Sequence, residues 1–174
     1  QNSAGESGGG IAANESTIII TNSAIANNVA GVDGGGIANY YGVLTITSST
    51  LMGNTASSQS PEGDGGGIQT SAGIVHLTNS TLSGNSALEE GGGIDNDFGT
   101  VTLTNSTLTN NTAAEGGGVS NEFASSGSSV FTSALILQRS LISGNVASTG
   151  AEVFNETGST VTANHFNLFG HKDL

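Results

Sequence analysis

Aliphatic residues occupy two fixed columns in five successive segments of the chain. They stand two places apart among threonines, as in the stretch Val-Thr-Leu-Thr at residues 101–104. One column comprises Ile18, Leu44, Val75, Val101 and Leu135, and the other comprises Ile20, Ile46, Leu77, Leu103 and Leu137. Alternation of apolar and polar residues with β-branched enrichment is typical of a strand that buries one face. Each segment is therefore predicted to contain a half-buried β-strand.

A glycine run precedes each of these strands. The run Gly-Gly-Gly-Ile or Gly-Gly-Gly-Val places its aliphatic residue at Ile11, Ile37, Ile68, Ile94 and Val119, with a weaker echo at residues 151–153. We expect a short strand after each glycine run and another around residues 108–112 and their equivalents, so that a unit has three strands. Such a unit matches one turn of a parallel β-helix, in which each strand pairs with its counterpart about 4.8 Å away in the next coil.

An aliphatic-x-x-Asn sequence ends each unit. The five asparagines are 26, 31, 26 and 34 residues apart, and the longer units carry insertions at 57–62 and 124–132, which we place in loops. The sequence thus predicts an all-β fold, a single right-handed, single-stranded parallel β-helix (β-solenoid) of about six coils over residues 1–174. The predicted units are 8–33, 34–64, 65–90, 91–115, 116–150 and a degenerate closing coil at 151–174.

Small and polar residues also recur in columns. The asparagine column, which we interpret as a structural ladder, comprises Asn28, Asn54, Asn85, Asn111 and Asn145. Serine recurs at Ser23, Ser49, Ser80, Ser106 and Ser140, and alanine at Ala30, Ala56, Ala87, Ala113 and Ala147. A side-chain amide at a bend can bond both the next amide in the stack and backbone groups that the turn removes from the sheet.

Composition narrows the possible partners. The chain has 28 glycines, one proline, no cysteine and 34% hydrophobic residues, which indicates many tight turns between short apolar strands. Its net charge of −12 disfavours nucleic acid and anionic membranes, because both require clustered basic residues. No apolar window is long enough for a membrane span, so no membrane insertion is predicted. Divalent cations and neutral glycans remain possible partners.

The repeat resembles known surface-protein repeats. Its Gly-Gly-aliphatic motif is similar to that of the polymorphic outer-membrane protein repeats of chlamydiae, whose Phe-x-x-Asn motif here has Leu or Ile in place of Phe. Units such as residues 99–108 also resemble the Thr- and Asn-rich β-helix repeats of large secreted proteins from environmental bacteria, which close on Asn-Leu-Phe-Gly, here residues 167–170. The resemblance implies a secreted or surface-exposed stalk, passenger or adhesin segment.

Acidic residues precede four of the glycine runs. They are Asp33, Asp64, Glu90 and Glu115, and the repeat predicts that they stack along one edge. Like charges about 5 Å apart repel by roughly 1 kcal/mol even in water. The side chains therefore either turn into solvent or bind a cation weakly, and calcium prefers such oxygen-rich surroundings. Both interpretations stay open, and no other cofactor is predicted.

Candidate catalytic groups are few. Asp95, Asp97 and Glu122 fall on adjacent predicted coils, and a glycosidase uses two carboxylates about 5 to 9.5 Å apart. Nothing in the sequence distinguishes these three from solvated charges, so we predict no enzymatic activity. The histidines are scattered and predict no metal site; they are His76, His165 and His171.

Outward threonines suggest a further function. Thr-x-Thr pairs at residues 45–47 and 102–104 are similar to those of ice-binding solenoids, but Ile19, His76 and Ile136 interrupt the array. Ordinary β-propensity also accounts for exposed threonine. Ice binding is therefore the least favoured of the functions considered.

The ends of the predicted stack complete the interpretation. The first glycine run begins just after Ser7, which leaves little room for an N-terminal cap, whereas Phe154, Phe166 and Phe169 are expected to cover the last coil. Because a terminal coil offers unpaired strand edges, we expect continuation into further repeats or end-to-end stacking of copies into filaments. The sequence predicts a secreted or cell-surface structural or adhesive segment. The alternative is a module that binds or cleaves a neutral glycan.

Overall fold

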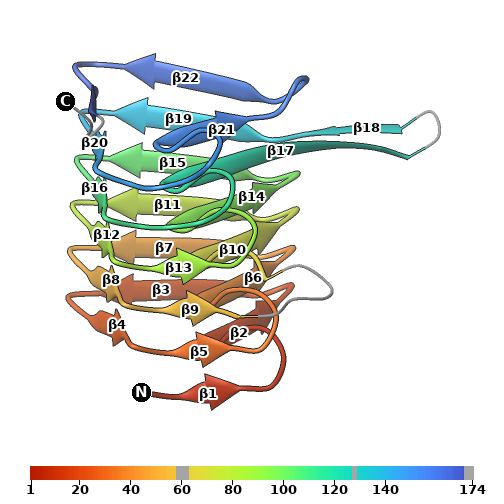
Figure 1. Ribbon diagram of the computed structural model, residues 1–174, viewed down its shortest axis with the longest axis vertical. Helices are drawn as coiled ribbons and strands as arrows, with labels where there is room; N and C mark the ends of the chain where they lie inside the picture. Colours follow the sequence, from red (N-terminus) through yellow and green to blue (C-terminus); the bar gives the residue numbers. More distant parts are fainter. Residues whose placement is uncertain (58–62, 127–128, 171–174) are drawn as a thin grey trace.

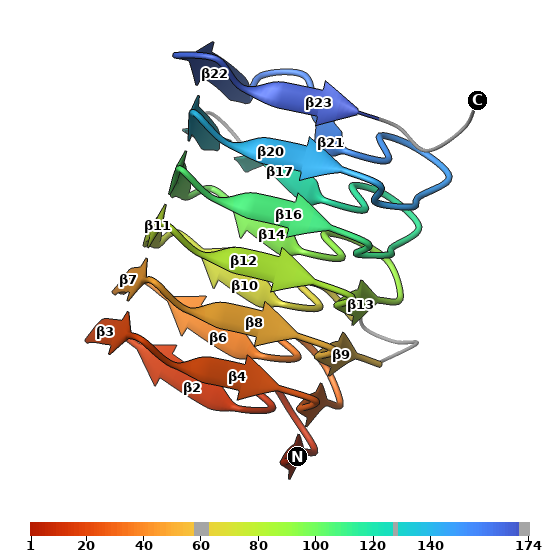
Figure 2. The ribbon, with the colours of Figure 1, turned by 90° about the vertical axis from the view of Figure 1, so that its left-hand side faces the viewer.

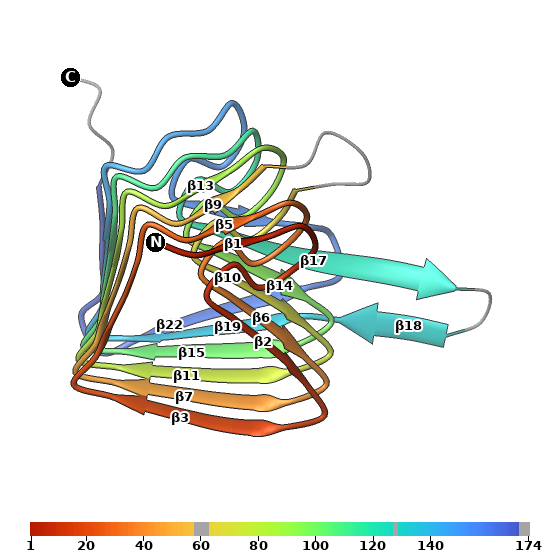
Figure 3. The ribbon, with the colours of Figure 1, turned by 90° about the horizontal axis from the view of Figure 1, so that it is seen from below.

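The chain winds as a right-handed β-helix. The structure is a computed structural model that describes residues 1–57, 63–126 and 129–170. Every regular element within these ranges is a β-strand, and successive coils rise along one axis (Figures 1 and 3). The predicted parallel β-solenoid of about six coils is confirmed. The end of the closing coil, with His171, lies outside the described residues.

Three six-membered stacks of parallel strands form the walls. The first sheet contains β2 (Ile11–Asn14), β6 (Ile37–Tyr40), β10 (Ile68–Ser71), β14 (Ile94–Asp97), β17 (Val119–Ser126) and β21 (Val153–Asn155). The second contains β3 (Thr17–Thr21), β7 (Val43–Thr47), β11 (Ile74–Thr78), β15 (Thr100–Thr104), β19 (Ala134–Gln138) and β22 (Thr160–Asn164). The third, seen in Figure 2, contains β4 (Ala24–Ala26), β8 (Thr50–Met52), β12 (Thr81–Ser83), β16 (Thr107–Thr109), β20 (Leu141–Ser143) and β23 (Leu168–Gly170).

A fourth, narrow sheet was not predicted. Its two-residue strands are β1 (Ser3–Ala4), β5 (Val29–Ala30), β9 (Thr55–Ala56) and β13 (Ser86–Ala87). The predicted alanine column supplies its inward side chains, since Ala30 and Ala56 are buried. The glycine bend passes close to this sheet, since a Cβ added at Gly35 would lie 2.4 Å from the carbonyl carbon of Thr55. This short fourth strand is present in the first four turns of the stack, and in the next two coils isolated bridges at Thr112 and Val146 continue the pairing.

The core is one continuous internal file of aliphatic side chains. Strand register stacks the second predicted column in order through the coils, from Ile20 to Leu137, and Ile46, Leu77 and Leu103 between them are almost completely buried. Burial of each such side chain contributes about 1.5 to 3 kcal/mol relative to leaving it in water. The predicted columns therefore form the interior that holds the coils together.

Side-chain ladders run parallel to the backbone ladders. The Nδ2 and backbone amide of Asn54 both donate to Oδ1 of Asn85 at 3.0 Å, and Asn54 Nδ2 also donates to the Ile25 carbonyl at 3.0 Å. The same arrangement recurs along the asparagine column. Asn2 joins it at one end, and the Glu152 carboxylate accepts from Asn145 at the other, where Oε2 lies 2.6 Å from Nδ2. Ladder bonds thus extend through the described coils.

A second internal ladder escaped the sequence analysis. It lies in the first sheet, two residues after the buried aliphatic residue of each strand, and comprises Asn39, Thr70, Asn96, Asn121 and Asn155. Asn96 Nδ2 donates to Asn121 Oδ1 at 2.7 Å, and Asn121 Nδ2 donates to Asn155 Oδ1 at the same distance. The interior is therefore partly polar. Its amide groups donate along the axis, but the buried Oδ1 atoms of Asn39 and Asn96 have no hydrogen-bond partner among the described residues.

Two expectations about irregular segments were wrong. The insertion at 124–132 is not a loop, since β17 runs on past the sheet and pairs antiparallel with β18 (Ser129–Thr132), a hairpin that projects from the stack (Figure 3). Antiparallel pairing satisfies backbone groups that a loop of this length leaves to water. The phenylalanine tail does not cover the last coil, because it forms that coil, and Phe166 is 99% exposed. Most of the insertion at 57–62 lies outside the described residues.

Candidate cation site

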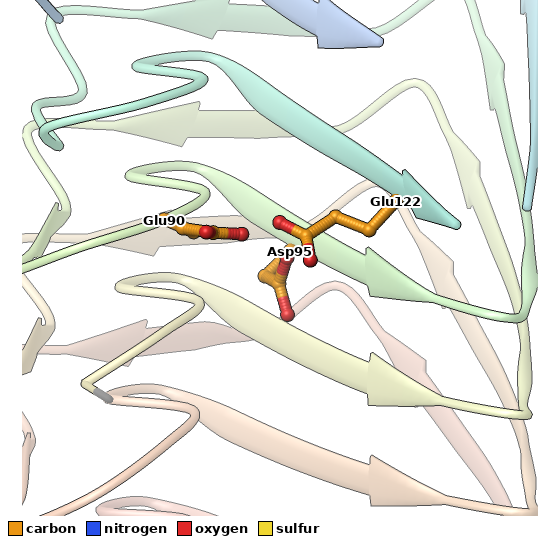
Figure 4. Close-up of side chains that lie close together, drawn as sticks. All are labelled: Glu90, Asp95 and Glu122. Atoms are coloured by element: carbon orange, nitrogen blue, oxygen red, sulfur yellow. The ribbon is translucent and has the colours of Figure 1, made fainter. Parts of the chain in front are cut away.

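Three carboxylates meet on the outer side of the first sheet. Asp95 belongs to β14, Glu122 belongs to β17 in the next coil, and Glu90 lies just before the glycine bend that leads into β14. The side chains of Glu90 and Glu122 reach toward Asp95 from opposite sides (Figure 4). One oxygen from each carboxylate lies within 4.8 Å of the oxygens from the other two. The stack thus gathers three negative groups from two successive coils.

The glycine bend buries Asp95 although its side chain points away from the core. Ile94 and Asn96 face the interior, so alternation along the strand directs Asp95 outward. Residues 91–93 fold back over this outer face, and a Cβ on Gly91 would lie 2.5 Å from the Asp95 amide nitrogen. Gly91 also has a φ of +62°, which glycine adopts without strain. As a result Asp95 is only 1% exposed.

The Asp95 carboxylate is enclosed without a counter-charge. Within the part of the chain that the structure describes, neither of its oxygens has a hydrogen-bond partner of normal geometry. Burial is the main cause that raises the pKa of Asp95 well above its ordinary value, followed by the negative charges of Asp97, Asp64 and Asp33. The Asn96 backbone amide acts weakly in the opposite direction on this pKa. An ionised carboxylate in such surroundings needs a positive partner.

Gln69 presents a further unsatisfied oxygen beside Asp95. The two residues are register partners on the neighbouring strands β10 and β14. Gln69 Nε2 donates to Asp97 Oδ2 at 3.3 Å, while its Oε1 is buried and has no hydrogen-bond partner among the described residues. On the other side, the Ser120 hydroxyl donates to Glu122 Oε1 at 3.0 Å and fixes that side chain. The site therefore holds carboxylate and amide oxygens in a fixed frame.

The predicted acidic edge divides between two roles. Its backbone is in register, but Asp64 Oδ1 accepts from the Glu90 amide at 3.0 Å, and Asp33 Oδ1 accepts from the Asp64 amide at 3.4 Å. These two carboxylates therefore support the turns of the next coil. Of the four residues at this edge, Glu90 joins the three-carboxylate cluster, while Glu115 pairs through its backbone with Glu90 and Thr149.

The candidate catalytic residues lie together on the first sheet. Asp97 and Glu122 are register partners, and Asp95 and Glu122 share the cluster. Asp95 is almost completely buried under the glycine bend, whereas Asp97 and Glu122 are only partly buried. His76 stands between Thr45 and Thr102 on the second sheet and interrupts the threonine row, and His165 follows β22.

The class of protein follows from this architecture: it is a parallel β-solenoid with a carboxylate cluster built across two coils. Neither a family model, nor a curated protein, nor a solved structure matches the chain. Among the described residues, no helix has the length and apolar character needed to cross a membrane.

Proposed function

We propose that this chain is a structural or adhesive segment of a secreted or cell-surface protein, in which it acts as a stiff rod. The observation that supports this proposal is the uninterrupted hydrogen bonding along one axis. Strand pairing joins every described coil to the next, and buried asparagine and serine ladders run in the same direction. A bend in the rod has to open buried hydrogen bonds on one side, each of which costs about 1 to 3 kcal/mol when left unsatisfied.

The surface chemistry fits an extracellular role in which no single residue is essential. The outward positions of the second sheet are mostly threonine, and the chain carries only two basic residues against 14 acidic ones. Such a surface repels anionic polymers and leaves neutral, hydroxyl-rich partners available for adhesion. Adhesion through a repeated surface uses many weak contacts, whose combined strength grows with the number of coils.

The experiment is to couple the chain to beads and measure their adhesion to a panel of neutral polysaccharides, while the supernatant is assayed for released sugars. A rod with adhesive function retains beads on at least one neutral glycan and releases no product. Product release that Asp95→Asn abolishes would overturn the proposal in favour of a glycan-cleaving module. Absence of adhesion to every surface would leave the purely structural form, which a high unfolding force along the axis in single-molecule pulling supports and a low one contradicts.

End-to-end self-association is a separate prediction. Static light scattering at increasing protein concentration measures it directly, because stacked copies raise the mean mass. A mass that stays at one chain, 17.1 kDa, over the whole concentration range would refute stacking and leave the monomeric rod.

A further inference from the structure

We propose that Glu90, Asp95 and Glu122 bind a calcium ion that joins two successive coils. The inference rests on Asp95, a buried carboxylate whose two oxygens have no hydrogen-bond partner among the described residues and which lies between two other carboxylates. A buried anion of this kind is expected to be protonated or to be paired with a cation. Glu90 and Glu122 place two more carboxylates beside it, so one cation bound here would neutralise charge on all three groups.

The geometry is compatible with a calcium ion. Calcium binds oxygen at about 2.3 to 2.6 Å, so two oxygens on opposite sides of one ion lie about 4.6 to 5.2 Å apart. The oxygens of this cluster lie within 4.8 Å of one another, which places all three within reach of a single central ion. Magnesium needs distances of about 2.0 to 2.1 Å and a near-octahedral shell, and it gives up its bound waters reluctantly, so a site built from protein oxygens favours calcium.

The donor set is that of a hard cation. All three groups are carboxylates, and zinc sites in proteins are built mainly from cysteine and histidine. Gln69 is the register partner of Asp95 on the neighbouring strand, and its buried Oε1 is a neutral oxygen of the kind that calcium sites also use. Glu90 and Glu122 are only partly buried, so water has access to complete a shell of six to eight oxygens.

Charge favours binding as well. When all three carboxylates are ionised they carry a charge of −3, which a divalent ion reduces to −1, and further carboxylates at Asp64 and Asp97 lie close enough to influence Asp95. The ion thereby replaces mutual repulsion between two coils with a shared attraction. Because Glu122 lies directly before the β17–β18 hairpin, the ion also fixes the point at which that hairpin leaves the stack.

The test uses the full chain, with calcium, magnesium and EDTA as the probes. Isothermal titration measures binding, and circular dichroism follows thermal unfolding. For the wild type we expect one calcium per chain, a higher Tm in calcium than in EDTA, and at least tenfold weaker binding of magnesium. Asp95→Asn keeps the size of the side chain and removes its charge, and it is expected to weaken calcium binding at least tenfold. Glu122→Gln gives a second variant at the less buried rim.

Glu115→Gln is the matched control, because Glu115 has the same position in the repeat as Glu90 but lies outside the cluster. It is expected to bind calcium within twofold of the wild type. The proposal is overturned if the wild type takes up no calcium at millimolar concentration, or if Asp95→Asn and Glu122→Gln bind as the wild type does. Equal loss in Glu115→Gln would also overturn it, since binding would then reflect the overall negative charge. Adhesion is assayed separately in EDTA, so failure of either proposal leaves the other intact.

Discussion

Removal of one asparagine from the middle of the ladder should destabilise the whole stack. In Asn85→Ala, the acceptor Oδ1 that serves both the backbone amide and Nδ2 of Asn54 is lost, together with the two bonds that Asn85 Nδ2 donates to Asn111 and to the Leu51 carbonyl. Asn54 is completely buried, so two of its N–H groups are left without an acceptor and without access to water. At about 1 to 3 kcal/mol for each unsatisfied group, the expected loss is about 2 to 6 kcal/mol.

The assay is urea unfolding followed by circular dichroism, with Asn2→Ala and Ser83→Ala as controls. Asn2 donates to Asn28 at the start of the ladder, and its loss leaves Asn28 Oδ1 still bonded to the Asn2 backbone amide at 3.0 Å. We therefore expect less than about 1 kcal/mol for Asn2→Ala, and within about 0.5 kcal/mol for the half-buried, outward Ser83. If Asn85→Ala and Asn2→Ala cost the same, the ladder does not carry the stability assigned to it.

Three further predictions concern the core, the glycine bend and pH. Leu103→Ala, at a completely buried position, should lower the free energy of unfolding by about 2 to 5 kcal/mol in urea titration. Ile19→Ala, at a position that is 73% exposed, should change it by less than about 0.5 kcal/mol. Equal effects of the two substitutions would contradict the internal file. Gly92→Ala places a Cβ 2.6 Å from the Gly117 carbonyl oxygen and from the Thr112 backbone. The coils then have to separate, so the Tm should fall sharply. An unchanged Tm would contradict this close approach. The pKa of Asp95 is higher in the folded than in the unfolded protein. In EDTA the folded state is therefore unaffected by this residue below the unfolded pKa near 4, where the carboxyl is protonated in both states. It loses stability as the pH rises toward and through the folded pKa. Asp95→Asn should therefore be more stable than the wild type in EDTA at pH 7.5, and the difference should vanish near pH 4; a difference independent of pH would contradict the burial of an ionisable group.

The sequence predicts the fold because each coil repeats the same chemistry. The column from Ile20 to Leu137 requires a shared interior, and the glycine before each strand requires a tight bend, so stacking follows from periodicity alone. The second amide ladder also left a signal, since Asn96 stands two residues after Ile94 and so faces the same side. A polar residue at such a position is ordinarily solvated, so the pattern alone does not distinguish an internal amide ladder from an exposed turn.

The site was harder to predict than the fold. Alternation places Asp95 on the outer face, where a charged residue is normally solvated, and only the path of the glycine bend over β14 encloses it. Sequence reasoning grouped Asp95 with Asp97 and Glu122, and grouped Glu90 with the other acidic residues before the glycine runs. The cluster takes members from both groups, because the bend brings the residue before the glycines back over the strand that follows them.

Glu152 gives the asparagine ladder a direction. Each amide in the ladder donates toward the following coil and accepts from the preceding one, whereas the Glu152 carboxylate only accepts, from Asn145 Nδ2 and from the Gly144 backbone amide. As far as this ladder is concerned, one interior coil can replace another, so duplication of a coil lengthens the ladder without interrupting its hydrogen bonds. The coil that carries Glu152 cannot take an interior place in the ladder, because a carboxylate has no N–H group with which to donate a hydrogen bond to a further asparagine.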